Sequence, residues 1–132
     1  MSEKINKEFL QKDKIIQQTV NGISRFLILW IIMERGPIHG YGLLKELNIF
    51  FEDIIDVGSI RKSSPSRVYP ILKNMEKTGL IKGVEKVQDN KKLFFYEITD
   101  AGEYLVYYIR DSFQTVIKSS TGAKFYKFLN EK

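Results

Sequence analysis

The sequence contains no cysteine, which excludes disulfide bonds and thiolate metal sites. It also contains a single histidine, His39, and one imidazole cannot build a metal site alone. No histidine–carboxylate pairing, nucleophile motif or phosphate-cradling glycine loop is evident in the sequence. We therefore predict that the protein is not an enzyme, and that it carries no cofactor, metal or catalytic residue.

Long hydrophobic runs are also missing. The longest is FLILWIIM, residues 26–33, whereas a helix needs ~20 apolar residues to span a bilayer. The N-terminal stretch MSEKINKEFLQKDK is charged and lacks the apolar segment of a signal peptide. With 132 residues and nine Phe and seven Tyr for a core, we expect one soluble cytoplasmic domain without a membrane partner.

Acidic residues are scarce in one quarter of the chain. Residues 61–92 hold nine Lys or Arg and three Asp or Glu, a net charge of +6, whereas the whole chain carries +5. The positive excess therefore lies entirely in this window. Such a concentration favours binding to phosphate backbones or anionic membranes, and the alternative is a solvated lysine-rich face.

Hydrophobic periodicity predicts a succession of helices with one hairpin. An amphipathic N-terminal helix carries Ile5, Phe9, Ile16 and Val20, and a second helix covers about residues 23–35. A third helix begins near residues 39–41. Its expected core face is Leu43, Leu47, Phe50 and Phe51. Apolar residues cover nearly the whole circumference of the second helix, which suggests a partner subunit.

The order of the elements predicts the fold class. Residues 84–87 and 93–98 read as two strands around a turn at 88–91, and Thr99 or Asp100 can cap a last helix. We predict a mainly α fold with a small β-hairpin wing (α+β), a winged helix-turn-helix. The predicted units are an N-terminal arm helix (1–22), a winged helix (23–100), and a C-terminal dimerisation helix with tail (101–132).

The segment SSPSRVYPILKNMEKTGLIKG, residues 63–83, predicts a fourth helix that contains an internal proline. Its apolar stripe is Val68, Ile71, Leu72 and Met75. The opposite side carries Ser66, Pro70, Lys73 and Lys77, and the flanks carry Arg67 and Tyr69. Either Ser64 or Ser66 can be the N-cap, and in both cases the bond lost at Pro70 faces solvent.

Hydroxyl, arginine, tyrosine and lysine side chains at a helix N-terminus suit contacts with phosphates and base edges. We therefore interpret this helix, with Lys91 and Lys92 at the wing tip, as a DNA-facing surface. The alternative is a solvent-facing amphipathic helix in which the proline has no role.

Three ordered motifs carry a resemblance to a known family. GPIHGYGLLKEL, SPSRVYPILKNMEKTGLIKG and FYEITDAG resemble the signatures of PadR-type transcriptional regulators, over about residues 28–105. The resemblance implies a homodimeric winged-helix repressor that binds palindromic operators of double-stranded DNA, often in its own operon. It also implies that Ser64–Arg67 and Tyr69 lie at the DNA.

By the same resemblance, His39 and Tyr41 open the helix that crosses the DNA backbone. The structural alternative is that Gly40 permits a close helix crossing and that Tyr41 packs. A different function class also stays open, namely a winged-helix architectural or protein-interaction module without operator specificity.

The last predicted helix carries a seam that suits a dimer. Val106, Ile109, Phe113 and Val116 follow the 3-4-3 spacing of a coiled-coil interface, although packing within one chain is the simpler alternative. Some family members bind phenolic acids or aromatic cationic drugs. Trp30, Tyr104 and Tyr108 are the aromatic residues that could form a pocket for a small aromatic effector, and ordinary core packing is the alternative.

Overall fold

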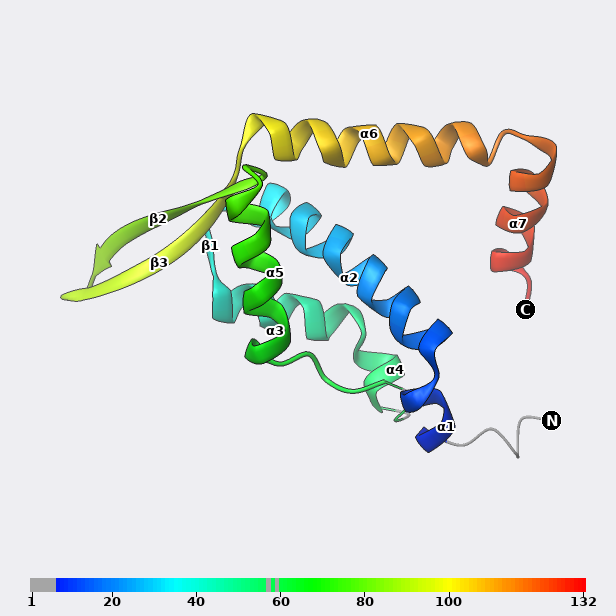
Figure 1. Ribbon diagram of the computed structural model, residues 1–132, viewed down its shortest axis with the longest axis horizontal. Coiled ribbons are helices and arrows are strands. Elements are labelled where there is room, and N and C mark those ends of the chain that lie inside the picture. The colour runs from blue at the N-terminus through cyan, green and yellow to red at the C-terminus, as the bar shows by residue number, and fades with distance from the viewer. Residues whose placement is uncertain (1–6, 57, 59) are drawn as a thin grey trace.

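The computed structural model describes residues 7–56, 58 and 60–132, and it has a winged-helix architecture (Figure 1). The helices are α1 (Lys7–Lys12), α2 (Lys14–Arg35), α3 (Gly40–Phe50), α4 (Glu52–Asp56), α5 (Pro65–Lys77), α6 (Asp100–Val116) and α7 (Ser120–Asn130). The strands are β1 (Ile38–His39), β2 (Ile81–Gln88) and β3 (Lys91–Ile98). The predicted fold class, mainly helical with a β-hairpin wing, is confirmed.

The predicted arm helix and second helix are largely one element. Asp13 caps α2, and its Oδ1 accepts hydrogen bonds from the backbone N–H groups of Ile15 (2.9 Å) and Ile16 (3.1 Å). The helix then continues through Gly22, which has open space around its Cα. The proposed division between residues 22 and 23 therefore lies inside α2, and Ile5 lies outside the described residues.

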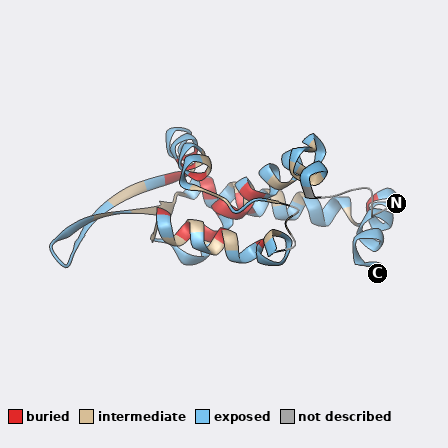
Figure 2. Ribbon diagram, turned by 90° about the horizontal axis from the view of Figure 1, so that it is seen from below, coloured by how far each residue is buried: buried red, intermediate tan, exposed pale blue. Residues whose placement is uncertain are grey.

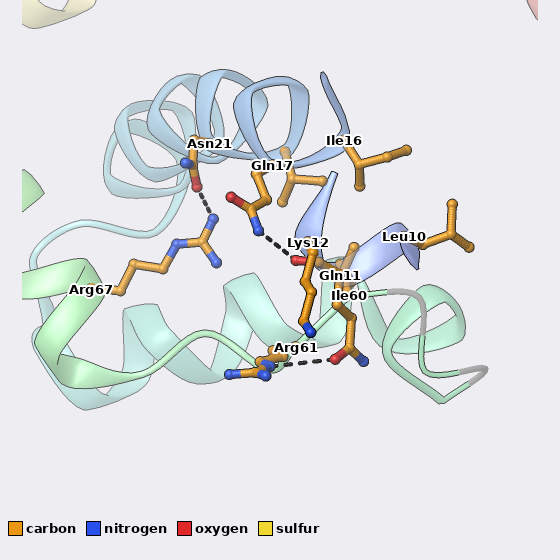
Figure 3. A pocket seen from close by; sticks show the side chains of 10 residues that line it. Leu10, Gln11, Lys12, Ile16, Gln17, Asn21, Ile60, Arg61 and Arg67 are labelled. Carbon is orange, nitrogen blue, oxygen red and sulfur yellow. Dashed lines mark hydrogen bonds between the residues drawn. The ribbon is translucent and has the colours of Figure 1, made fainter. Parts of the chain in front are cut away.

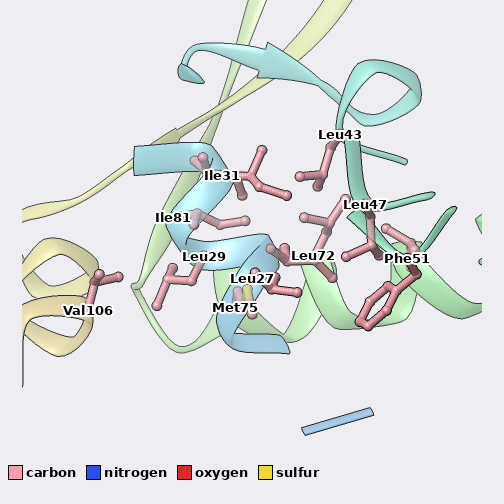
Figure 4. Packing of buried hydrophobic residues seen from close by; sticks show 13 residues of the cluster. Leu27, Leu29, Ile31, Leu43, Leu47, Phe51, Leu72, Met75, Ile81 and Val106 are labelled. Carbon is pink, nitrogen blue, oxygen red and sulfur yellow. The ribbon is translucent and has the colours of Figure 1, made fainter. Parts of the chain in front are cut away.

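The core is built around the C-terminal half of α2. Figure 4 shows apolar side chains of α2, α3 and α5 meeting there, with Ile81 and Val106 completing the cluster. The fully covered members are Ile28, Ile32, Leu43, Leu47, Leu72, Ile81 and Val68. The C-terminal half of α2 therefore buries most of its apolar side chains within its own chain and needs no partner for them, whereas Ile15, Ile23 and Trp30 stay exposed.

One predicted core residue lies outside the core. Leu43, Leu47 and Phe51 are buried at spacings of four residues, whereas Phe50 is 58% exposed. The prediction for Phe50 was wrong because α3 ends there, and the buried stripe passes through Phe51 at the C-cap.

By length and composition α2 would be able to cross a membrane, having 22 residues and a mean hydropathy of 1.3 over its most apolar window. Its most apolar turns, however, pack inside the winged helix, and Leu27, Ile28 and Leu29 are all buried. A core helix of a folded domain therefore accounts for this composition.

The wing is a tight hairpin attached to the core by a third strand. Strands β2 and β3 pair antiparallel up to Gln88 and Lys91, so the connecting turn is Asp89-Asn90. These two residues have φ angles of 53° and 63°, the left-handed conformation that a two-residue type I′ turn requires. The short strand β1 pairs with β3 in the order β1-β3-β2.

The C-terminal helices leave the body of the domain. Thr99 caps α6, since its Oγ1 accepts a hydrogen bond from the Gly102 backbone N–H (3.1 Å). Figure 1 shows α6 starting near the C-terminal end of α2 and diverging from it, with α7 turning sharply away at the far end of α6. Ser119 is the N-cap of α7. Figure 2 shows that exposed residues predominate on α6, α7 and the wing.

Candidate nucleic-acid interface

The N-cap of α5 is Ser64, with Pro65 at the first helical position. Of the two caps considered from sequence, the structure has this one. The Ser64 carbonyl accepts hydrogen bonds from the backbone N–H groups of Arg67 (3.1 Å) and Val68 (3.0 Å), while its hydroxyl lies 3.0 Å from the Ser66 hydroxyl. Because the Ser64 side chain does not cap the helix, the start of α5 offers hydroxyls and backbone donors to an outside partner.

The loop before α5 is fixed by Asn48 of α3. The Asn48 Oδ1 accepts a hydrogen bond from the Ser63 backbone N–H (2.8 Å), and its Nδ2 donates to the Ser63 carbonyl (3.2 Å). This two-point contact sets the entry of the chain into α5. Sequence reasoning missed it, because an asparagine in the last turn of a helix carries no periodic signal.

Pro70 lies on the exposed face of α5, away from the core. Its missing N–H would have bonded the Ser66 carbonyl, and Ser66 is also exposed, so water can solvate that carbonyl. Lys73 and Lys77 are exposed on α5 as well, whereas Val68 and Leu72 are buried. The helix therefore separates an apolar inner stripe from a polar outer face.

Arg67 and Tyr69 flank this outer face and are each held by another element. The half-buried Arg67 donates a hydrogen bond from its guanidinium to Oδ1 of Asn21 on α2. Tyr69 is 44% exposed, and its ring lies over Gly40, where a Cβ would come within 2.6 Å of the Tyr69 Cε1. The absence of a side chain at Gly40 thus lets α3 and α5 approach each other closely. The side chain that packs on Gly40 is Tyr69 of α5.

His39 and Tyr41 have different environments at the start of α3. His39 is the N-cap, and its Nδ1 accepts a hydrogen bond from the Gly42 backbone N–H (2.9 Å). Its ring also packs edge-on against Phe95 at a centroid distance of 5.7 Å. Tyr41 stacks on the His39 ring at a centroid distance of 6.4 Å but is 72% exposed, so it packs against its neighbour without entering the core.

The wing is fastened to α5 by Glu76. The Glu76 carboxylate accepts a hydrogen bond from the Gly83 backbone N–H of β2 (3.1 Å). Burial raises the pKa of the nearby Tyr96 phenol above its ordinary value, and the Glu76 charge and Tyr69 raise it further. The bond between Glu76 and Gly83 therefore joins α5, with its polar outer face, to the wing in one packed unit.

The tip of the wing is positively charged and projects away from the helical part of the domain (Figure 1). Lys91 and Lys92 are both exposed at the start of β3, opposite Gln88 and Val87. Figure 1 shows the hairpin projecting from the side of the domain next to α5. Nearer the body, Lys82 forms a salt bridge with Glu97 at 3.2 Å. At the tip, Lys91 and Lys92 outnumber Asp89 of the turn, so the tip keeps a net positive charge.

The predicted seam on α6 has two environments. Val106 is 3% exposed and belongs to the core of its own chain. Ile109 is half-buried, whereas Phe113 is 63% and Val116 53% exposed. Packing within one chain therefore accounts for the first part of the seam, and the last part is uncovered.

The three predicted effector residues do not share one pocket. Trp30 lines an apolar groove of about 450 Å³ between α2 and α6, together with Phe26, Phe50 and Tyr107. Tyr104 and Tyr108 stack on each other at a centroid distance of 6.2 Å and are not among the residues that line this groove. Within the described ranges, no cluster of three or more His, Cys, Asp or Glu side chains could hold a metal ion.

Solved structures of similar fold include two with comparable sequences. A PadR-like transcriptional regulator from Bacillus cereus is 25% identical, with a TM-score of 0.66 over 87% of this chain and 99% of its own. A proposed transcriptional regulator from Thermoplasma acidophilum is 27% identical, with a TM-score of 0.58 over 76% of this chain and 89% of its own. No curated protein sequence matches the chain.

The family assignment follows from the sequence match itself. Residues 28–106 match the model of the transcriptional regulator PadR-like family, and this range includes α3, α5 and the whole wing. The family consists of transcriptional regulators that bind DNA, not of enzymes. The chain therefore belongs to the PadR-like family of transcriptional regulators.

Proposed function

We propose that the protein is a cytoplasmic, homodimeric repressor that binds palindromic operators in double-stranded DNA, in a nearby operon or its own. The observation that carries this proposal is the outer face of α5. It presents hydroxyls, Tyr69 and two lysines beside a basic wing tip, within the window that holds the whole positive excess. Its uncapped N-terminal turn suits base edges and phosphates in a major groove.

The residues proposed to face the DNA divide into two roles, and two of them, Ser64 and Arg67, are half-buried. Ser64, Ser66, Arg67 and Tyr69 contact base edges and nearby phosphates, and Pro70 holds their turn in shape. Lys73, Lys77, Lys91 and Lys92 bind phosphates, which positions the protein without reading sequence. Tyr41 approaches the DNA backbone from the start of α3, where it is exposed, and His39 positions that turn through its bond to Gly42.

Uncovered apolar side chains at the C-terminal end support the dimer. Phe113 and Val116 of α6 are more than half exposed, and so are Phe125, Phe128 and Leu129 of α7. Soluble monomers rarely leave several large apolar side chains of neighbouring helices this open to water. A two-fold dimer through these helices would place two copies of α5 for the two halves of a palindrome.

The decisive experiment for the DNA proposal is selection of genomic fragments by the purified full chain. A specific regulator enriches a shared motif and binds it about a thousandfold or more tighter than random DNA at physiological salt. Equal affinity for both would favour the second function class, an architectural or protein-interaction module.

The dimer is tested by sedimentation equilibrium, which should give twice the chain mass of 15.4 kDa. Phe113→Asp with Val116→Asp should shift the protein to monomer with its fold intact. The control is Tyr104→Asp, because Tyr104 is 71% exposed and lies on the opposite side of α6. A wild-type protein that sediments as a monomer contradicts the dimer.

A small aromatic effector would enter at Trp30, which is 41% exposed in the groove between α2 and α6. Saturable quenching of Trp30 fluorescence by a phenolic acid or a cationic dye supports this proposal. Its absence across a panel of both classes favours a regulator without an aromatic effector.

A further inference from the structure

A second cavity lies at the junction of the N-terminal arm and the start of α5. It has a volume of about 330 Å³, within the range of small-molecule sites, and Figure 3 shows its lining. The walls come from α1, the first turns of α2, the loop before α5, and α5 itself through Arg67. It is distinct from the groove at Trp30, with which it shares no lining residue.

The charged groups of this cavity are positive only. Arg61, Arg67 and Lys12 line it, and no Asp or Glu is among its lining residues. Lys12 is already paired with Glu8 at 2.9 Å. In the part of the chain that the structure describes, neither arginine has a carboxylate within salt-bridge distance.

The two arginines are held instead by neutral amides. The Arg61 Nε donates to Oε1 of Gln11 (3.4 Å), and the Arg67 guanidinium donates to Oδ1 of Asn21 (Figure 3). A guanidinium has five N–H donors, so these bonds leave most of each fork available. The planar fork matches a carboxylate or phosphate in two-point contacts, which are stronger than bonds to amides.

The rest of the lining is aliphatic except for Gln17, whose Nε2 donates a hydrogen bond to the Gln11 backbone carbonyl. Leu10, Ile16, Val20 and Ile60 complete the walls, and no aromatic residue is among the lining residues. An inorganic anion would leave these side chains in contact with water, and a stacked aromatic ligand would find no ring to stack on. An anion with a short hydrocarbon chain can use both parts of the site, because each CH₂ group buried against the aliphatic wall adds to its affinity.

We infer that this cavity binds an amphipathic aliphatic carboxylate of medium chain length, with its carboxylate at Arg61 and Arg67 and its chain on the aliphatic wall. The consequence for regulation rests on the proposed function. Arg67 belongs to the turn of α5 that is proposed to contact DNA, so a carboxylate that binds the Arg67 guanidinium competes with DNA for it. Occupation of the cavity therefore weakens operator binding.

The test is calorimetric titration of the purified full chain with sodium octanoate. Acetate and inorganic phosphate are the controls that have a charge but no chain, and octan-1-ol is the control that has a chain but no charge. Octanoate should bind saturably and about tenfold or more tighter than any of the three. Binding of phosphate or acetate equal to that of octanoate overturns the inference, because the site would then be only a basic patch.

Two matched arginine variants locate the site. Arg61→Gln removes one fork and should weaken octanoate binding about tenfold, whereas Arg35→Gln removes an arginine of α2 that lines neither cavity and should change it less than about twofold. Circular dichroism verifies that both variants are folded. Octanoate affinity that is unchanged by Arg61→Gln, or lost equally in both variants, overturns the assignment of the site.

Fluorescence anisotropy with the selected operator tests the coupling separately. Saturating octanoate should raise the operator dissociation constant of the wild type, and Arg61→Gln should blunt this response at the same octanoate concentration. Octanoate that binds without changing operator affinity overturns the competition at Arg67 and leaves the site standing. Failure of the ligand-free protein to select any operator counts against the proposed function alone.

Discussion

A methyl group added at Gly40 tests how Tyr69 is positioned at the proposed DNA face. An alanine Cβ there would lie 2.6 Å from the Tyr69 Cε1 and 2.7 Å from its hydroxyl oxygen. Both distances are below van der Waals contact, so the ring has to move. Since Tyr69 is 44% exposed and the clash involves the end of its ring, the ring can turn towards solvent.

The effect of Gly40→Ala on stability should therefore be small. Overpacking a well-packed core costs about 1–3 kcal/mol, but here the displaced group has open space beside it. Alanine also favours a helix over glycine by up to about 1 kcal/mol. These terms oppose each other, and we expect the free energy of unfolding to change by less than about 1 kcal/mol, measured by urea denaturation.

The effect on operator affinity should be larger. A side chain that makes a good specific contact contributes about 1–3 kcal/mol, which corresponds to a loss of about five- to 150-fold when Tyr69 is displaced. Fluorescence anisotropy with the selected operator measures this loss. Gly22→Ala is the matched control, because a Cβ at Gly22 meets nothing within 4 Å, and it should leave operator affinity unchanged.

A double-mutant cycle decides whether Tyr69 transmits the effect. Gly40→Ala should weaken operator binding in the wild-type background and have little effect in a Tyr69→Ala background. Tyr69→Phe keeps the ring and removes only the hydroxyl, which separates packing from hydrogen bonding. Equal losses from Gly40→Ala with and without the tyrosine would refute this reasoning, and the glycine would then act through the backbone of α3.

Four further outcomes follow from the same structure. Changing Lys91 and Lys92 to Ala should weaken binding to operator and random DNA about equally and make the salt slope shallower by about one to two units, whereas a loss for the operator alone would show base reading by the wing. Gly102→Ala should lower the free energy of unfolding by about 1–3 kcal/mol or more, measured by urea denaturation, because its Cβ would lie 2.1 Å from a backbone carbonyl oxygen. The raised pKa of Tyr96 means that its contribution to stability is present below about pH 10 and is lost as pH rises through the folded-state pKa, so Tyr96→Phe should flatten the fall of the melting temperature above pH 10. Pro70→Ala should leave thermal stability unchanged or raise it while reducing operator affinity, and destabilisation without a separate loss of DNA binding would make this proline structural.

Local patterns in the sequence were sufficient for most of the secondary structure. The stripe of Val68, Leu72 and Met75 is buried, and the capping of α6 by Thr99 matches one of the two residues expected. These features depend on residues a few positions apart, where helix geometry fixes which side chains share a face. The two strands were also predicted, although β2 begins at Ile81, three residues before the expected start.

Features that depend on tertiary contacts were not predictable in the same way. A boundary was expected between residues 22 and 23, yet α2 continues through Gly22, because packing of the following turns outweighs a penalty of about 1 kcal/mol for a mid-helix glycine. Strand β1 has two residues, too few for any periodicity. The helical period of α6 likewise predicts that Val106 and Phe113 share a face, but not that only Val106 reaches the core of its own chain.

The same limit applies to the proposed DNA face, with a consequence for specificity. The motif places Arg67 on a flank of α5, but its partner Asn21 is 46 residues away in the sequence. The entry into α5 is likewise set by Asn48 of α3, and its far end by the bond between Glu76 and Gly83. Two long-range polar contacts and one between neighbouring elements therefore fix the direction of α5. Relatives that share the motif but differ at Asn21 or Asn48 should present the same side chains in a different orientation, so operator preference should follow these supporting residues as well as the DNA-facing ones.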